Sequence, residues 1–299
     1  MICRQLEKIK FIESADMKEY TSFKVGGRAS MLVMPKNMDE LKRTLKIVTS
    51  FKKDFIVMGN GSNLLVKDGG FDGIIIKLGE GFNQITVNKE EHIILAGAGA
   101  LLSKIAREAL EAELTGFEFA SGIPGTMGGA LFMNAGAYNH EMSQVVKEAR
   151  VVASDGSRDY TISTDKMELE YRKSIFVKTG DIIISVTLKL EIGKKENILE
   201  TMKDLTARRN EKQPMNFPSA GSFFKRPEGD YAGKLIEDAG LKGLMVGGAR
   251  ISPLHAGFII NTGKATAKDI ISLMRLVQST VYDKTGVKLE PEVRIIGED

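Results

Sequence analysis

The spacing of apolar residues along this chain alternates between the period of a helix and that of a strand. Apolar residues three or four apart predict helices over residues 37–53, 101–114, 196–214, 231–240 and 266–286. Runs rich in Val, Ile and Leu predict extended segments over residues 21–36, 54–59, 244–248, 257–261 and 287–296. Asn37 or Asp39 can cap the first helix. The last helix has Thr266 as its cap, with Asp269 three residues on, and Gly286 as its stop.

The connections between these segments predict hairpins as well as a β-α-β unit. Residues 84–100 are hairpin-like, and two further hairpins are expected around Asp155-Gly156 and Thr179-Gly180. Because helices and hairpins are mixed in each section, the pattern favours an α+β architecture over one doubly wound sheet. A chain of 299 residues is long enough for two domains or three small ones. We place domain boundaries near residues 81 and 203, which gives residues 1–81, 82–203 and 204–299.

Composition excludes several classes of protein. Hydrophobic residues make up 42% and charged residues 27%, a globular balance, and a net charge of +3 is too small for a protein that binds nucleic acid or membranes by charge. The single cysteine, Cys3, excludes a disulfide framework, and with only three histidines we expect no metal site. The first residues lack the apolar stretch of a signal peptide, and no run reaches the ~18 apolar residues of a membrane span, so we expect a cytoplasmic protein.

Glycine is the unusual residue, with 31 in the chain, and its positions indicate ligand-binding loops. Residues 59–66, GNGSNLLV, follow a predicted buried strand, where a glycine turn exposes backbone N–H groups that suit a phosphate. Residues 121–138, SGIPGTMGGALFMNAGAY, suit a flat or anionic ligand. An ordinary turn and a helix packed through small residues are the respective alternatives. Two such loops in separate sections favour a dinucleotide held between domains.

Polar side chains from several sections can complete such a site. The Arg172 guanidinium can grip a carboxylate through two hydrogen bonds, or it can be a solvated surface group. Arg208 and Lys212 are four residues apart on one helix face, which suits a diphosphate or a solvated face. Ser222 stands between Ala-Gly and two phenylalanines, so it is either a rigidly held hydroxyl or a turn residue. Glu292 either donates a proton from a buried position or pairs with a neighbouring arginine.

Taken together, these stretches resemble the UDP-N-acetylenolpyruvoylglucosamine reductase family over nearly the whole chain. The motifs occur in the family's order: TSFKVGG, GNGSNLLV, SGIPGTMGGA with NAGAY, YRKS, AGSFFKRP, LKGL and LEPEVRIIG. The resemblance implies a two-subdomain FAD-binding fold of the vanillyl-alcohol oxidase (PCMH) type, followed by a C-terminal α+β substrate-binding domain. The Tyr-bearing capping insertion of the family's longer branch is not apparent between Tyr171 and Glu191, so the chain resembles the shorter branch.

The family's site residues carry over to numbered positions in this sequence. Arg172 would orient and polarise the enolpyruvyl carboxylate, Ser222 would donate a proton, and Glu292 would stabilise the enolate-like intermediate together with Arg172. The residues implied to contact the UDP-sugar and its diphosphate are Tyr171, Arg208, Lys212, Lys225 and Lys242. Arg226 stands where one branch has asparagine and is not assigned to a ligand. The residues implied to contact the cofactor are Gly59, Asn60, Gly61, Ser62, Asn63, Leu64, Ser121, Gly122, Ile123, Pro124, Gly125, Gly128, Gly129, Asn134, Ala135 and Gly136.

The resemblance also implies an activity. NADPH would reduce a non-covalently bound FAD, and the reduced flavin would reduce the enolpyruvyl ether of UDP-N-acetylglucosamine enolpyruvate to UDP-N-acetylmuramate. This reaction belongs to peptidoglycan synthesis, and hence to cell-wall biogenesis, cell shape and cell division. Two other readings stay open: another FAD-dependent oxidase or dehydrogenase of the same fold, and a non-catalytic nucleotide-binding module. The expected partner is a small-molecule substrate, without nucleic acid or membrane, and the expected oligomeric state is a monomer.

Overall fold

The computed structural model describes residues 2–299, and the contacts within the chain group them into two compact units. Unit 1 comprises the residues up to Ile12, Met31–Asn60 and Gly73–Arg208, and unit 2 comprises Glu13–Ser30, Gly61–Asp72 and Arg209–Asp299. The chain passes from one unit to the other within β1 (Lys10–Asp16), β2 (Arg28–Met34), β5 (Phe71–Lys77) and α6 (Lys195–Lys212), and between Asn60 and Gly61. Each unit has its own hydrophobic core.

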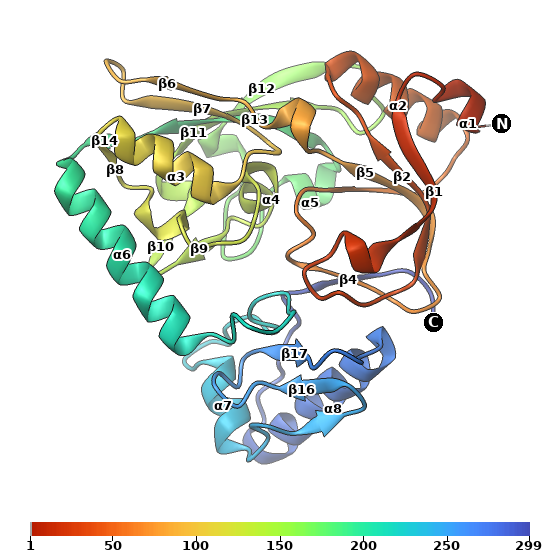
Figure 1. Cartoon of the computed structure of the whole chain (residues 1–299), viewed down its shortest axis with the longest axis vertical. Coiled ribbons are helices and arrows are strands. Elements are labelled where there is room, and N and C mark those ends of the chain that lie inside the picture. Colours follow the sequence, from red (N-terminus) through yellow and green to blue (C-terminus); the bar gives the residue numbers. More distant parts are fainter. Residues whose placement is uncertain (1) are drawn as a thin grey trace. The chain divides into compact units, whose positions relative to one another are not determined.

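Unit 1 is built on a five-stranded antiparallel sheet with the order β12-β11-β13-β7-β6 (Figure 1). Its strands are β6 (Ile85–Asn88), β7 (Ile93–Gly97), β11 (Val146–Val152), β12 (Asp159–Ser163) and β13 (Ile182–Lys189). The register pairs Val186 with Ala149 on one side and with Ala96 on the other. All three side chains are fully buried, so they form one row of the core across the middle of the sheet.

Helices α3 (Leu102–Glu111) and α4 (Met127–Phe132) contact this sheet. In α3 the residues Ile105, Ala106 and Ala109 are buried while the positions between them are exposed, as expected for an amphipathic helix lying on a sheet. The small elements of this unit are α1 (Ile2–Gln5), β8 (Leu114–Thr115), β9 (Gly136–Ala137), β10 (His140–Glu141), α5 (Phe176–Thr179) and β14 (Glu191–Ile192).

A second part of unit 1 contains the predicted β-α-β segment. Helix α2 (Met38–Ser50) begins at Asn37, whose side chain accepts a hydrogen bond from the Glu40 N–H at 2.9 Å. It leads into β3 (Phe55–Met58), which pairs in parallel with β5 so that Met58 lies opposite Lys77. The two strands are neighbours in a four-stranded sheet of order β1-β2-β5-β3. Parallel strands bring their carboxyl ends to one edge, which places Gly59 next to the end of β5.

Unit 2 combines a small sheet with two helices. The antiparallel order is β15-β16-β17. Its elements are β4 (Leu64–Val66), α7 (Ala232–Asp238), β15 (Met245–Val246), β16 (Ala249–Ile251), β17 (Ile259–Asn261), α8 (Ala267–Thr285) and β18 (Arg294–Ile296). Strand β4 pairs in parallel with β18. The Asp68 carboxylate accepts hydrogen bonds from the Ala267 and Lys268 N–H groups at 2.9 and 2.8 Å, which stabilises the start of α8.

Most of the predicted elements are confirmed. The hairpins β6–β7 and β11–β12 form, and α8 begins with the capping box of Thr266 and Asp269 and ends at left-handed Gly286. The hairpin expected around Thr179-Gly180 is wrong. Residues Phe176–Thr179 form the helical turn α5, and Gly180, with φ of +71°, ends that turn. Phe176 is buried and Val177 is exposed, which is the alternation expected of a strand. Over so few residues this alternation does not distinguish a strand from a helical turn.

The predicted domain boundaries at residues 81 and 203 differ from the division into units. Residue 81 coincides with no crossing point, whereas residue 203 lies near the crossing after Arg208. The difference has a physical cause, because Phe23, Val25 and Leu65 are buried in the core of unit 2 among C-terminal residues. Early segments of the chain therefore complete the core of the last section.

The described residues contain neither a helix suited to span a membrane nor a cluster of metal-binding side chains. None of the helices formed by residues 2–299 is long and apolar enough to cross a membrane. Across the same residues, no three His, Cys, Asp or Glu side chains are grouped so that they could hold a metal ion.

Candidate functional site

The two glycine-rich loops of the sequence meet inside unit 1. The Asn60 Nδ2 donates a hydrogen bond to the Pro124 carbonyl at 3.1 Å. A Cβ atom at Gly59 would lie 2.0 Å from the Thr126 Oγ1, so only glycine allows the two loops to approach this closely. The first loop follows β3 and the second precedes α4. The structure therefore brings the first residues of the predicted loops 59–66 and 121–138 together.

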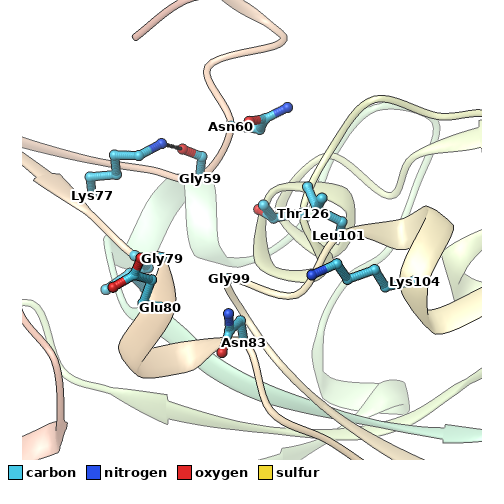
Figure 2. A pocket seen from close by; sticks show the side chains of 11 residues that line it. Gly59, Asn60, Lys77, Gly79, Glu80, Asn83, Gly99, Leu101, Lys104 and Thr126 are labelled. Carbon is cyan, nitrogen blue, oxygen red and sulfur yellow. Dashed lines mark hydrogen bonds between the residues drawn. The ribbon is translucent and has the colours of Figure 1, made fainter.

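A pocket of about 160 Å³ opens where these loops meet the ends of β5 and β7 (Figure 2). Its lining consists of Gly59, Asn60, Lys77, Leu78, Gly79, Glu80, Asn83, Gly99, Leu101, Lys104 and Thr126. Figure 2 shows the amines of Lys77 and Lys104 pointing toward the pocket from opposite sides. With two lysines and one glutamate, the lining is net positive and suits an anionic ligand.

Lys77 is the less exposed of the two cations of this pocket. Its Nζ donates a hydrogen bond to the Gly59 carbonyl at 2.8 Å. Burial lowers the pKa of the Lys77 ammonium below its ordinary value, because desolvation disfavours the charged form. Sequence reasoning missed Lys77, Lys104 and Thr126. The signal available for Lys77 was its place at the end of the apolar run Ile74–Ile76, directly before glycine-rich residues.

The second glycine loop packs against Ala98 and also contributes Thr126 to the lining of the pocket. A Cβ at Gly128 would lie 2.8 Å from the Ala98 Cβ, and the Gly128 N–H donates to the Ala98 carbonyl at 2.9 Å. The alternative interpretation, a helix packed tightly through small residues, therefore holds for Gly128. Gly129 is exposed. The Ser121 hydroxyl donates a hydrogen bond to the Glu118 carbonyl at 2.8 Å. The main chain beside Asn60 is that of Pro124, whose carbonyl accepts from the Asn60 side chain.

Arg172 is held by the end of this loop in a strained backbone conformation. Its φ of +56° lies in the left-handed region, which is costly for a residue other than glycine. Its guanidinium donates to the carbonyls of Asn134 and Gly136 at 3.4 and 3.3 Å. The Asn134 side chain is fully buried and donates to the Glu170 carbonyl at 3.1 Å while accepting from the Ser143 N–H at 2.9 Å. Asn134 thus ties the Arg172 segment to the loop, and its main-chain N–H donates to the Leu131 carbonyl at 3.0 Å.

Tyr171 lies beside Arg172 at the surface. The Arg172 Cζ is 4.7 Å from the centroid of the Tyr171 ring, within the range of a cation–π interaction. The Tyr171 side chain is 44% exposed, so it can contact a bound ligand.

Ser222 and Glu292 come together in unit 2, although they are about 70 residues apart in the sequence. The Glu292 N–H donates to the Phe223 carbonyl at 2.8 Å, and the Phe223 N–H donates to the Gly257 carbonyl at 2.8 Å. Left-handed Gly221, with φ of +76°, turns the chain just before Ser222. Ser222 is exposed, whereas Phe223 beside it is fully buried, so a fixed main chain presents the hydroxyl at the surface.

The remaining part of the first glycine loop lies alongside the Glu292 segment. The Asn63 Nδ2 donates to the Glu292 carbonyl at 3.1 Å, and the Arg294 N–H donates to the Asn63 carbonyl at 3.1 Å. Gly61 has a left-handed φ of +64°, as predicted for a glycine turn. Leu64 begins β4 and is buried in this unit. Unit 2 therefore collects Ser222, Glu292 and the loop residues after Asn60.

The basic residues implied to bind the substrate have acidic neighbours. Arg208 pairs with Asp204 at 2.9 Å on α6, Lys225 with Glu290 at 3.1 Å, and Lys242 with Glu237 at 2.7 Å. Lys212 is exposed at the end of α6. Exposed pairs of this kind contribute only about 0–1 kcal/mol, so an anionic ligand can displace the acidic partner at low cost. Arg226 stacks on the Tyr231 ring, 4.0 Å from its centroid.

Matches to known proteins extend over nearly the whole chain. Residues 29–158 match the family model described as an FAD binding domain, and residues 213–296 match the model of the UDP-N-acetylenolpyruvoylglucosamine reductase C-terminal domain. The chain is 52% identical over 287 residues to the UDP-N-acetylenolpyruvoylglucosamine reductase of Clostridium botulinum (strain Alaska E43 / Type E3), covering 96% of this chain and 93% of the relative. It is 50% identical over 283 residues to that of Alkaliphilus oremlandii, covering 95% and 92%.

A solved structure supports the same grouping. The crystal structure of UDP-N-acetylenolpyruvylglucosamine reductase from Thermus caldophilus is similar with a TM-score of 0.82 and 38% sequence identity, covering 96% of this chain and 98% of that one. The α+β prediction, with an FAD-binding part followed by a reductase C-terminal domain, is confirmed.

Proposed function

Because this chain belongs to the UDP-N-acetylenolpyruvoylglucosamine reductase family, we propose that it reduces the enolpyruvyl ether of UDP-N-acetylglucosamine enolpyruvate to UDP-N-acetylmuramate for peptidoglycan synthesis. The observation that carries this proposal is identity of about half over nearly the full length of named reductases, together with both an FAD-binding part and the reductase C-terminal domain. FAD is the cofactor, and NADPH is the proposed reductant. We place the reaction in the cytoplasm and assign a monomer as the working form.

The residues of unit 1 fit the anionic portion of FAD. Gly59 permits the close approach of Thr126 that joins two walls of the pocket, and Lys77 and Lys104 supply positive charge to it. Bound FAD would supply the hydride that adds to the β-carbon of the enolpyruvyl group. A diphosphate has the charge that this net positive lining attracts.

Arg172 would bind the enolpyruvyl carboxylate. Two main-chain carbonyls fix its guanidinium in advance, so little reorganisation is needed when negative charge develops on the substrate. Glu292, held by its main chain against the Ser222 segment, would stabilise the same charge as a hydrogen-bond donor in its protonated form. Such preorganised groups are typically worth about 3–4 kcal/mol each when one is removed.

Ser222 would deliver a proton to the α-carbon of the substrate. A serine hydroxyl is a weak acid, so it can protonate only a strongly basic, carbanion-like centre. The fixed main chain on both sides of Ser222 restricts where that hydroxyl can lie. Arg208, Lys212, Lys225 and Lys242 would neutralise the diphosphate of the UDP-sugar, and Tyr171 would contact the bound substrate.

The test separates the two halves of the reaction. The purified protein should be yellow, should bleach anaerobically when NADPH is added, and should regain its colour when UDP-N-acetylglucosamine enolpyruvate follows. Failure of this last step would contradict the reductase assignment, and recovery of colour with oxygen alone would favour an oxidase of the same fold. A colourless protein that does not take up FAD would instead indicate a nucleotide-binding module.

A further inference from the structure

Lys77 lies at a position in the fold where removing a charged side chain from water costs free energy. It ends strand β5 directly after Ile74, Ile75 and Ile76, which are at most 2% exposed. Its own side chain is partly buried. A desolvated ammonium needs a counter-charge or several acceptors to offset the loss of water.

The protein itself provides only one such partner. Within residues 2–299 Lys77 forms no ion pair, and its side chain makes a single hydrogen bond, to the Gly59 carbonyl at 2.8 Å. Figure 2 shows this bond together with the other residues that line the pocket. Glu80 also lines the pocket but is exposed and is not within ion-pair distance of Lys77. The charge of Lys77 is therefore left for a ligand to neutralise.

The partner of Lys77 belongs to the wall of the cofactor pocket. Gly59 is confined on its other side by Thr126, since even a methyl group there would overlap the Thr126 side chain. Asn60, the next residue, is bonded to the Pro124 carbonyl. A displacement of the Gly59 carbonyl would consequently disturb the contact between both glycine loops.

We propose that Lys77 is a cofactor-binding residue that fixes the Gly59 carbonyl and supplies the positive charge neutralising the diphosphate of FAD. The charged side chain is the part of the pocket that distinguishes a phosphate-bearing flavin from one without phosphate. The lowered pKa of the Lys77 ammonium agrees with a charge that lacks full compensation in the protein alone. This inference depends on FAD as cofactor and not on the reductase reaction proposed above.

The experiment measures the binding of two flavins to the apo-protein. Flavin fluorescence titrations give the dissociation constants of FAD and of riboflavin, which has no phosphate, for the wild type, Lys77→Met and Lys77→Arg. Lys46→Met is the matched control, because it removes an exposed cation of unit 1 that does not line the pocket. Far-UV circular dichroism and thermal unfolding of each apo-protein report the fold.

We expect Lys77→Met to weaken FAD binding about ten- to a hundredfold, the usual range for a lost charged hydrogen bond, and to change riboflavin binding less than about twofold. Lys77→Arg should retain most of the FAD affinity, and Lys46→Met should lose less than about threefold. Unchanged FAD binding in Lys77→Met would overturn the proposal. An equal loss for FAD and riboflavin would also overturn it, because Lys77 would then act only through the fold.

A second variant covers the case in which Lys77→Met does not fold. Lys77→Gln keeps a donor for the Gly59 carbonyl but carries no charge. The proposal expects it to lose FAD affinity while riboflavin affinity is kept. Wild-type affinity for FAD in a folded Lys77→Gln protein would show that the charge is dispensable. All of these readouts are independent of catalysis, so they stand even where the reductase assay gives no activity.

Discussion

Two residues at the proposed substrate site have strained, left-handed backbone conformations. Arg172 has a left-handed backbone, and Asn134, which accepts one of its hydrogen bonds, is also left-handed with φ of +42°. Each such residue costs on the order of 1–3 kcal/mol and persists only where the surroundings impose it. Here the buried Asn134 side chain, bonded to two other segments, provides that constraint. Two of the left-handed residues of the described chain therefore hold the guanidinium that we assign to the substrate carboxylate.

The proposed role of Ser222 makes a prediction about the two half-reactions. Ser222→Ala should leave reduction of FAD by NADPH nearly unchanged and should slow reoxidation by the enolpyruvyl substrate about 10²–10⁴-fold, because it removes only the proton donor. Anaerobic stopped-flow absorbance of the flavin measures both steps. Ser219→Ala, three residues earlier in the same SAGS run, is the matched control and should behave as the wild type. Equal losses in both half-reactions would mark Ser222 as structural.

The contact between Gly59 and Thr126 makes a second prediction at this scale. Gly59→Ala should destabilise the protein by about 1–3 kcal/mol and weaken FAD binding, because the new methyl group overlaps Thr126 Oγ1, which is buried. Thr126→Ala removes that oxygen, so the double variant should recover part of the loss. Urea denaturation and FAD titration of the four proteins complete a double-mutant cycle. Strict additivity would contradict the assigned contact.

At the scale of elements, an ion-pair cluster joins α2 to the β11–β12 hairpin. The Asp159 carboxylate accepts from the Arg150 guanidinium at 2.6 and 3.0 Å and pairs with Lys42 of α2. Hydrogen bonds from Lys42 and then Arg150 are the largest causes that lower the pKa of Asp159 from 3.8 to about 2.

The lowered pKa of Asp159 predicts how the free energy of unfolding changes with pH. Between pH 4 and pH 2 the unfolded chain binds more protons at residue 159 than the folded one, so stability rises with pH there. The contribution is fully present above the unfolded value of 3.8 and is lost as the pH falls through about 2. Thermal unfolding of the wild type and Asp159→Asn from pH 2 to pH 5 measures it. The two curves should converge toward pH 2, and a constant separation would contradict the assignment.

For the whole molecule, the bound cofactor is expected to contribute to stability. A ligand present at 100 times its dissociation constant adds about 2.7 kcal/mol to the native state, which for a protein of this size raises the melting temperature on the order of 5 °C. Removal of FAD should therefore lower the melting temperature, and saturating FAD should restore it. Differential scanning fluorimetry with and without FAD measures the shift, with riboflavin as the comparison ligand. An apo-protein that gains no stability from FAD would contradict the cofactor pocket.

Features that depend on neighbouring residues were predictable from the sequence. Helix α2 with its Asn37 cap, helix α8 with its capping box and Gly286, and the β6–β7 and β11–β12 hairpins all follow from local periodicity and turn chemistry. The glycine loops and the motifs of the family resemblance could likewise be recognised in the sequence. The turn at Thr179-Gly180 was not, because a four-residue helical turn and a short strand have the same local pattern.

The contacts between distant residues, in contrast, became known only from the folded chain. The bond of Lys77 to Gly59, the approach of Gly59 to Thr126, the Asp68 carboxylate at the start of α8, and the Ser222 segment beside Glu292 join positions with no local sequence relation. Nor does a local pattern show that Phe23, Val25 and Leu65 complete the core of the C-terminal section. Periodicity reports which face of an element is apolar, whereas the partner of that face is fixed by packing across the whole chain.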